Sequence, residues 1–359
     1  MRIDNEIKLD FSDVLIRPKR STLNSRKDVS LERTYRFLHS SKVWKGIPIM
    51  TANMDTTGTF DMARALAEYK MITALHKFYS VDELKDFFSS FDNPDYIAYS
   101  LGIRDEDIDK LRKVVSLGMD KKFTFIVVDV PNAYLERFVY KLKEIRRLCP
   151  DHIIIAGNVV TNEMTEEILI KGADIVKVGI GSGSACTTRR QTGVGYPQLS
   201  AVIECADASH GITNKEVGYG LIVSDGGVQY PSDVAKAFCG GADFVMLGSL
   251  FAGFKESGGK LIEKDGTQFK EYYGMSSSRA MKLHYGGVAE YRASEGRITH
   301  IPYKGLVGDF VQDLLGSLRS TGTYIGARKL KEFSRRATFI MVNRQLNTSI
   351  AEYDLKNKS

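Results

Sequence analysis

The 359-residue sequence has no apolar run long enough to span a bilayer, and its start, MRIDNEIKLDFSDV, is too charged for a secretory signal. It also has no Pro/Ser-rich linker and no low-complexity tract. Its basic residues are dispersed apart from short clusters such as Arg17–Arg20, and no amphipathic basic helix is present, so we expect neither nucleic acid nor a membrane as a partner. These absences predict one globular domain over residues 1–359 in the cytoplasm.

Cysteine is also scarce, with four residues that form neither a CxxC pair nor a Cys/His ligand spacing, which argues against structural zinc. Without an export signal the thiols should be reduced. Cys149, Cys205 and Cys239 lie in helical or apolar contexts typical of buried fillers. Cys186 differs, because it lies in the glycine-rich stretch VGIGSGSACTTRRQTGVGYPQLSA beside two threonines and two arginines. The net charge of +6 fits either attraction for a phosphorylated small molecule or an ordinary solvated surface.

Short apolar runs recur along the chain, and most are separated by amphipathic, helix-like segments such as 59–69, 162–172 and 231–241. The runs are too short and too rich in β-branched residues for buried helices, so they predict strands. Without polar alternation they predict a parallel sheet covered on both faces. Eight strand–helix units predict an α/β fold, a (β/α)8 TIM barrel with long loops on its catalytic face. A doubly wound open sheet is the alternative, but no GxGxxG opens a helix after the first strand. The predicted strands are 47–55, 71–77, 95–102, 123–130, 152–158, 174–181, 220–227 and 244–249.

In this fold the active site lies at the C-terminal ends of the strands, so the polar and glycine residues that close the runs should meet at one mouth. Two segments interrupt the rhythm, 182–197 and 254–308, and neither has the pattern of core; long loops at this face are commonly lids or substrate clamps. The chain then continues through two segments, 309–326 and 329–336, that predict closing helices and a loose basic tail. The residues expected at the mouth are Asn53–Asp55, His76–Lys77, Asp129, Asn158, Gly181–Cys186, Asp225–Gly227 and Gly248–Ser249.

Two consecutive glycine turns, SDGG at 224–227 and GADFVMLGS at 241–249, lie where this fold usually binds phosphate. A tight turn needs glycine anyway, so a purely structural role is the alternative. Asp225 could accept hydrogen bonds from ribose hydroxyls or cap the next turn.

The Cys186 loop suggests nucleophilic chemistry. A lone cysteine is by default buried and inert, but Arg189 and Arg190 nearby would favour the nucleophilic thiolate. Thr188 could pass a proton if a carboxylate or a lysine oriented it, and Glu295 and Lys77 are candidates. From spacing alone, Glu295 is better explained as a solvated surface charge. The glycines on each side of Ser182 let the backbone aim carbonyls inward, as a cation or ligand site would need.

The motifs SGSACTTRRQTGVGYPQLSAVIECADASHG, SDGG, GADFVMLGS, YGMSSSRAM and GGVAEYRASEG resemble the IMP dehydrogenase/GMP reductase family nearly from end to end. The resemblance to its reductase branch implies NADPH-dependent reductive deamination of GMP to IMP and ammonia in purine nucleotide salvage. It implies that Cys186 attacks purine C2, that Thr188 and Glu295 handle the proton for the leaving ammonia, and that Lys77 assists.

The same resemblance implies the binding residues. A monovalent cation, expected to be K⁺, would bind the carbonyls of Gly181, Gly183 and Cys186. The family also implies a homotetramer. The ribose phosphate of GMP or IMP would contact Asp225, Gly226, Gly227, Gly248, Ser249, Gly274, Met275 and Ser276, and Arg292, Ala293, Ser294, Glu295 and Gly296 would close over the base. NADPH would lie along Lys77, Asp129, Val130 and Pro131, with Ser25, Arg26, Ser320, Thr321, Gly322 and Thr323 reaching it from a neighbouring subunit.

Two alternatives remain. An IMP dehydrogenase would use the same cysteine to oxidise IMP with NAD, but its members usually carry a regulatory module after the second strand, where HKFYS here runs directly into VDELKDFF. A catalytically weakened, regulatory purine-nucleotide-binding protein is the other alternative. It is motivated by departures from the family pattern that put cofactor affinity and rate in question, at Phe78, Pro131, Ala133, Ser182, Ala185 and Ser249.

Overall fold

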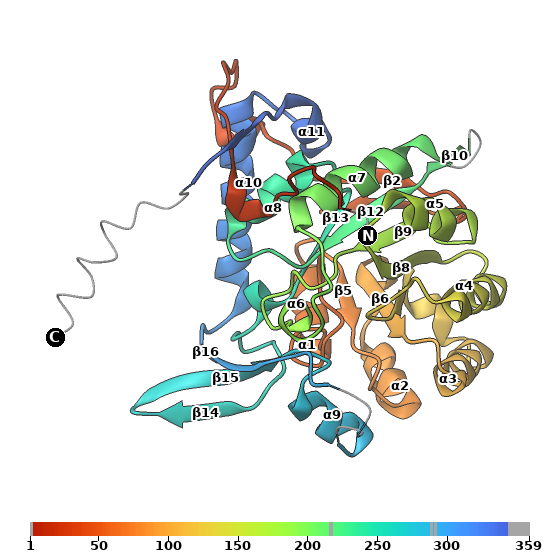
Figure 1. Cartoon of the computed structure of the whole chain (residues 1–359). Coiled ribbons are helices and arrows are strands. Elements are labelled where there is room, and N and C mark those ends of the chain that lie inside the picture. Colours follow the sequence, from red (N-terminus) through yellow and green to blue (C-terminus); the bar gives the residue numbers. More distant parts are fainter. Residues whose placement is uncertain (1–2, 215–217, 288–289, 291–292, 344–359) are drawn as a thin grey trace.

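The computed structural model describes residues 3–214, 218–287, 290 and 293–343, and its centre is an eight-stranded parallel sheet (Figure 1). The first and last strands of the sheet meet through the Met50–Ile72 bridge, where the Thr51 amide donates to the Ile72 carbonyl at 3.1 Å, so the sheet closes. The predicted α/β (β/α)8 barrel is therefore confirmed, and all eight predicted strands are present. In sheet order they are β4 (Ile49–Thr51), β13 (Phe244–Leu247), β12 (Leu221–Asp225), β9 (Ile175–Val178), β8 (Ile153–Val159), β7 (Phe125–Asp129), β6 (Ile97–Leu101) and β5 (Thr73–Leu75).

Helices connect successive strands on the outside of the barrel, and their local sequences explain where they begin. Ser80, for example, starts a helix with a capping box, in which its hydroxyl accepts from the Glu83 amide at 3.1 Å and the Glu83 carboxylate accepts from the Ser80 amide at 2.6 Å. The outer helices are α1 (Phe60–Ala67), α2 (Val81–Ser90), α3 (Asp105–Ser116), α4 (Glu136–Leu148), α5 (Asn162–Ile170), α7 (Gln198–Gly211), α8 (Pro231–Cys239) and α10 (Val307–Ile325). Among the described residues, none of the helices has both the length and the apolar character that crossing a bilayer requires.

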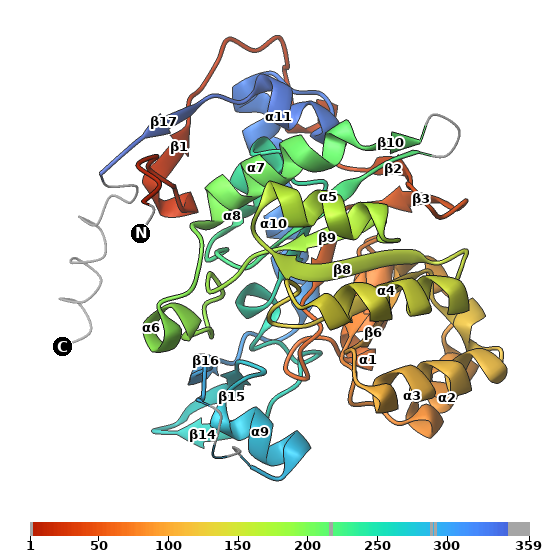
Figure 2. The same ribbon diagram turned by 45° about the vertical axis from the view of Figure 1, so that its right-hand side comes forward.

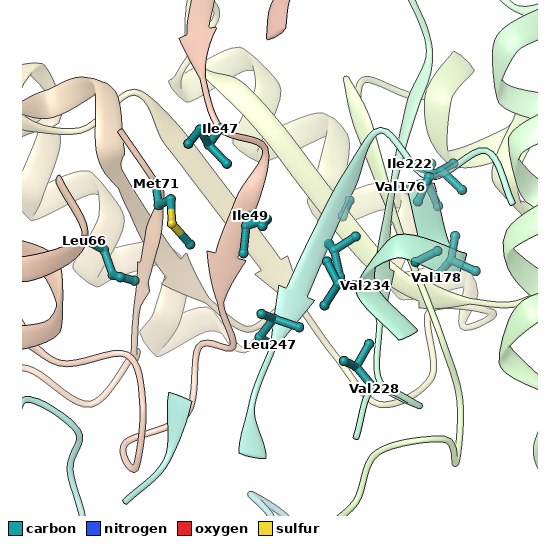
Figure 3. Packing of buried hydrophobic residues seen from close by; sticks show 14 of the residues in the cluster. Ile47, Ile49, Leu66, Met71, Val176, Val178, Ile222, Val228, Val234 and Leu247 are labelled. Carbon is teal, nitrogen blue, oxygen red and sulfur yellow. The ribbon is translucent and has the colours of Figure 1, made fainter. Parts of the chain in front are cut away.

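Two hydrophobic clusters hold the barrel together. The larger fills the space between strands and helices; Figure 3 shows part of it, with Ile49, Val176 and Leu247 on the strands, Leu66 on α1 and Val234 on α8. The smaller fills the barrel interior, and it is closed at the N-terminal end by the hairpin of β2 (Arg33–Arg36) and β3 (Val43–Gly46).

That closing hairpin inserts aromatic rings between the strand starts. The Tyr35 and Phe244 rings stack with 4.7 Å between their centroids, and the centroid of the Trp44 ring lies 5.4 Å from that of Phe244. We expect Phe244→Ala to lower the free energy of unfolding by about 3–5 kcal/mol, because the site cannot collapse around the lost ring. Trp44 is the only tryptophan, so its fluorescence during urea unfolding reports the change. The matched control, Leu117→Ala at a 54% exposed position, should leave the midpoint nearly unchanged; an equal shift in both variants would contradict the packing argument.

The region 254–308, expected as loop outside the core, is instead largely structured. A three-stranded antiparallel sheet of β14 (Leu261–Lys264), β15 (Thr267–Tyr273) and β16 (Ile298–Pro302) carries α9 (Ser278–Tyr285), and we call residues 261–302 the flap. Asp265 and Gly266, both with positive φ, form the two-residue turn between β14 and β15, which is a recognisable hairpin signal. Phe254, 3% exposed, belongs to the main core.

The described part of the predicted loose tail is instead structured, and its remainder, residues 344–359, lies outside the described residues. After the short helix α11 (Phe333–Arg336), β17 (Phe339–Met341) pairs antiparallel with β1 (Val14–Ile16). A small hairpin of β10 (Thr213–Asn214) and β11 (Gly218–Tyr219) precedes β12. Figure 2 shows the flap at one end of the barrel with α6 (Thr188–Thr192) beside it, and the β2–β3 hairpin toward the other end.

Candidate active site

A pocket of about 760 Å³ lies at the C-terminal ends of the strands, between the Cys186 loop and the flap. It is the mouth that the sequence predicts. Of the predicted site residues, those that line it are Asp129, Val130, Pro131, Gly181, Gly183, Cys186, Thr188, Asp225, Gly226, Gly274, Met275, Ser276 and Glu295.

Within this pocket a chain of hydrogen bonds joins the thiol to a carboxylate. The Cys186 thiol lies 3.2 Å from the Thr188 hydroxyl, and that hydroxyl donates to the Glu295 carboxylate at 2.6 Å. A proton can therefore pass between sulfur and carboxylate without solvent. From spacing alone, Glu295 was interpreted as a solvated surface charge. That interpretation is wrong, because Glu295 lies in the flap, which packs this side chain beside the cysteine loop.

The backbone of the flap fixes this meeting. Cys186 and Gly296 form an antiparallel β-bridge between the cysteine loop and the flap. Beside it, the Thr187 amide donates a hydrogen bond to the Glu295 carbonyl at 2.8 Å. Glycine is required at this contact: a Cβ on Gly296 would lie 2.8 Å from the Ser277 amide nitrogen, and one on Gly274 would lie 2.9 Å from the Ala185 carbonyl. The two glycines thus let segments far apart in sequence touch.

Arg189 does not act as expected. Its guanidinium donates to the Asp10 carboxylate at 2.9 Å and to the Tyr196 carbonyl at 2.5 Å, so its charge is compensated and it braces the loop. Arg190 is exposed. The polar partner that the structure gives the thiol is Thr188 rather than an arginine.

The other three cysteines are buried, as predicted. Burial raises the pKa of each of their thiols to about 12, which keeps Cys149, Cys205 and Cys239 protonated and unreactive. His76, expected at the mouth, does not line the pocket. Burial lowers the pKa of its imidazole to about 4, and its ring stacks on the Tyr79 ring with 3.8 Å between the ring centroids.

Several described residues that line the pocket were not predicted, and Lys177 is the charged one among them. Lys177, in the middle of the apolar run DIVKVGIG, reaches the carboxylates of both Asp129 and Asp225. Its side chain is 4% exposed. A lysine at a buried strand position is the signal that could have identified it, because an ammonium is rarely buried without a specific partner.

Comparisons with known proteins agree with this geometry. Residues 8–352 match the model of the IMP dehydrogenase / GMP reductase domain. The chain belongs to that family. It is 55% identical over 348 residues to GMP reductase 2 of Mus musculus, covering 96% of this chain and 97% of the relative. It is 54% identical over 353 residues to GMP reductase 2 of Homo sapiens (98% and 99% covered) and 55% identical over 356 residues to GMP reductase of Caenorhabditis elegans (99% and 97% covered).

The remaining described site residues that the family resemblance implies do not line the pocket. Gly227 donates its amide to the Ser182 carbonyl at 2.9 Å, and the Ser294 hydroxyl accepts from the Ser278 amide at 3.0 Å. Arg292 lies outside the described residues. Those that the structure describes but that do not line the pocket are Ser25, Arg26, Lys77, Gly227, Gly248, Ser249, Ala293, Ser294, Gly296, Ser320, Thr321, Gly322 and Thr323.

The cysteine loop also suits the monovalent cation that the family implies. The carbonyls of Ser182, Ser184 and Ala185 accept hydrogen bonds from Gly227 and Arg297. Within the described part of the chain, the carbonyls of Gly181 and Cys186 accept none, and that of Gly183 accepts one, from the Cys186 amide at 2.9 Å. Neutral backbone carbonyls are ligands that K⁺ takes in proteins, so these three fit the predicted cation site.

Two departures from the family pattern have structural partners. The Ser182 hydroxyl donates to the Gln198 side-chain carbonyl at 2.7 Å, which ties the cysteine loop to α7. The Phe78 ring stacks on His284 of α9 at 3.5 Å, and His284 also hydrogen-bonds the Asp55 carboxylate at 2.6 Å. Phe78 and Asp55 therefore hold α9 against the barrel.

We expect His284→Ala to loosen the flap, since it removes both the stacked ring and the Asp55 contact. Limited trypsin digestion should then cut within the flap at least about threefold faster, because local opening exposes the cleavage sites. Leu283→Ala, at a 56% exposed position on the same helix, is the matched control and should digest like wild type. Equal digestion of all three proteins would show that these contacts do not hold the flap.

Proposed function

We propose that the chain is a GMP reductase, an oxidoreductase that uses NADPH to convert GMP to IMP and ammonia. The observation that carries the proposal is the Cys186–Thr188–Glu295 hydrogen-bonded chain in the pocket. The names of the relatives, at 54–55% identity over nearly full length, support the same choice within the family.

The proton chain suits the first half of this reaction. The Cys186 sulfur bonds to purine C2, and the bond from C2 to the exocyclic amino group breaks. The thiol proton passes through Thr188 to Glu295 and then to the departing amine, which leaves as ammonia. The products are a thioimidate on Cys186 and free ammonia, with every proton accounted for.

The second half replaces sulfur by hydrogen at C2. Bound NADPH supplies the hydride, and IMP leaves as the C2–S bond breaks and returns the thiolate to Cys186. In this proposal Asp129, Val130 and Pro131 orient the nicotinamide side of the pocket, with Lys77 beside them. Asp225 and Gly226, which also line the pocket, face the nucleotide together with Gly274–Ser276.

The wider assembly is also part of the proposal. Ser25 and Arg26 lie near the end of α10 that carries Ser320–Thr323, and none of these residues lines the pocket of its own chain. If they bind the cofactor, a neighbouring subunit must supply them, as a homotetramer would. K⁺ at the carbonyls of Gly181, Gly183 and Cys186 would brace the loop. A catalytic free thiol fits a reducing compartment such as the cytoplasm.

Turnover with defined substrate pairs tests the proposal. Purified protein in potassium buffer should deplete NADPH absorbance with GMP, at a rate above that with NADH, and should form no NADH from IMP and NAD. Oxidation of IMP with NAD would instead indicate a dehydrogenase. GMP binding without turnover of either pair would indicate the weakened nucleotide-binding protein.

A further inference from the structure

Lys177 occupies an unusual position for a charged residue. The other members of β9 are apolar, and Ile175, two residues earlier and on the same face of the strand, packs in the barrel interior. The lysine therefore projects into the uppermost layer of the barrel, beneath the pocket that it helps to line. Water cannot solvate its ammonium, so its stability there depends on fixed partners.

Those partners come from three neighbouring strands. The Lys177 ammonium contacts Asp129 at the end of β7 at 3.0 Å and the Asn158 side-chain carbonyl of β8 at 2.8 Å, and it pairs with Asp225 at the end of β12. Three acceptors match the three N–H donors of an ammonium. The Asn158 amide donates in turn to the Asp225 carboxylate at 2.9 Å. The network therefore joins the carboxylate assigned to the cofactor, Asp129, to the one assigned to the nucleotide, Asp225.

Exposure shows which member of the network faces a ligand. The side chains of Asp129 and Asp225 are 33% and 21% exposed, whereas that of Lys177 is 4% exposed. A bound molecule thus meets the carboxylates, and the ammonium lies behind them. In this arrangement the ammonium orients the carboxylate oxygens toward a ligand, and its positive charge does not contact the substrate.

Charge supports this arrangement. Burial lowers the pKa of Lys177, but attraction to Asp129 and Asp225 outweighs it and raises the pKa well above its usual value, so the ammonium stays charged. Burial raises the pKa of Asp129, but the charge and hydrogen bond of Lys177, the Asn53 hydrogen bond and the Lys77 charge together outweigh it, so the net shift is downward. Each ion therefore keeps the other ionised.

We propose that Lys177 is a positioning residue that fixes Asp129 and Asp225 for the cofactor and the nucleotide, and so links the two halves of the pocket. The inference rests on the proposed function, in which these carboxylates receive hydrogen bonds from the two ligands. Lys177 itself touches neither ligand.

The test compares Lys177→Met, which keeps length and loses charge, with Lys177→Arg, which keeps charge. We expect the KM for GMP and the KM for NADPH both to rise at least about tenfold in Lys177→Met, since charged hydrogen bonds orient both carboxylates. The GMP dissociation constant from calorimetry, which needs no turnover, should rise in parallel. Lys177→Arg should recover part of both losses.

Two further readouts separate positioning from general damage. Without the ammonium the pKa of Asp129 rises, because only the Asn53 hydrogen bond and the Lys77 charge remain to oppose the effect of its burial. The ratio of the KM for NADPH of Lys177→Met to that of wild type should therefore be largest at low pH and should fall as the pH rises. In the double variant Lys177→Met/Asp129→Asn, which removes one charge of each sign, the combined loss should be smaller than the product of the single losses.

The outcomes distinguish the two proposals. If wild type neither binds GMP nor oxidises NADPH with it, the proposed function fails. If wild type is active and Lys177→Met has wild-type constants for both ligands, the positioning role is wrong. The inference is also overturned if the rise in KM of Lys177→Met does not depend on pH and the double variant loses as much as the product of the two single losses. Lys177 would then be merely structural. Should Lys177→Met fail to fold, Lys177→Arg and the charge-balanced double variant give the same decision.

Discussion

Cys186→Ala should abolish turnover of GMP with NADPH, with kcat lowered at least about 10⁴-fold, because none of the other described residues that line the pocket carries a thiol to form the bond to C2. GMP binding should persist within a fewfold of wild type, since the predicted contacts to the ribose phosphate come from other residues. Cys186→Ser should be nearly as inactive, because a hydroxyl is a far weaker nucleophile than a thiolate. Steady-state rates and calorimetry measure both effects.

Alkylation provides the control for this prediction. Cys186 is the one partly exposed cysteine, and the other three are buried with thiols whose pKa is raised to about 12. Iodoacetamide should therefore modify Cys186 first, GMP should slow that modification, and Cys149→Ala should remain active. Substantial activity in Cys186→Ala would remove the cysteine from the mechanism.

Thr188→Val should give the second-largest effect, a loss of about 10²–10⁴-fold in kcat with little change in KM, since it removes the link between thiol and carboxylate while keeping the side-chain shape. Glu295→Gln should behave similarly. Because the two residues act as one unit, the double variant should be scarcely slower than the slower single variant. Pre-steady-state release of ammonia measures the step directly.

Thr187→Val is the matched control for Thr188→Val. Its hydroxyl makes no hydrogen bond within the described residues, although it lies next to Thr188 in the same loop. We expect wild-type rates for this variant. If Thr187→Val loses as much activity as Thr188→Val, loop packing rather than proton transfer explains both results.

The sequence was most informative about the barrel, for a physical reason. Each strand buries both faces, so runs such as FTFIVVDV lack polar alternation and are recognisable alone. The same rule placed Asp129, Asn158 and Asp225 at one mouth, because parallel strands end at the same edge. The structure brings these side chains into one network.

Other features depend on contacts between distant segments, which spacing does not contain. Glu295 meets Thr188 across 107 positions of sequence, so its isolated pattern resembled a surface charge. The flap strands lack the apolar runs of the barrel, and two of them, β14 and β16, are largely exposed. In contrast, the Asp265–Gly266 turn and the buried Lys177 were visible signals that a closer interpretation of the sequence would have used.

The central claim is that hydrogen from NADPH replaces the amino group at C2 of GMP. It is tested most directly by mass analysis of the product after turnover with NADPH carrying deuterium at both nicotinamide C4 positions. The account predicts IMP carrying one deuterium at C2, with IMP, ammonia and NADP⁺ formed in equal amounts. IMP without deuterium, or oxidation of NADPH without release of ammonia, would contradict it.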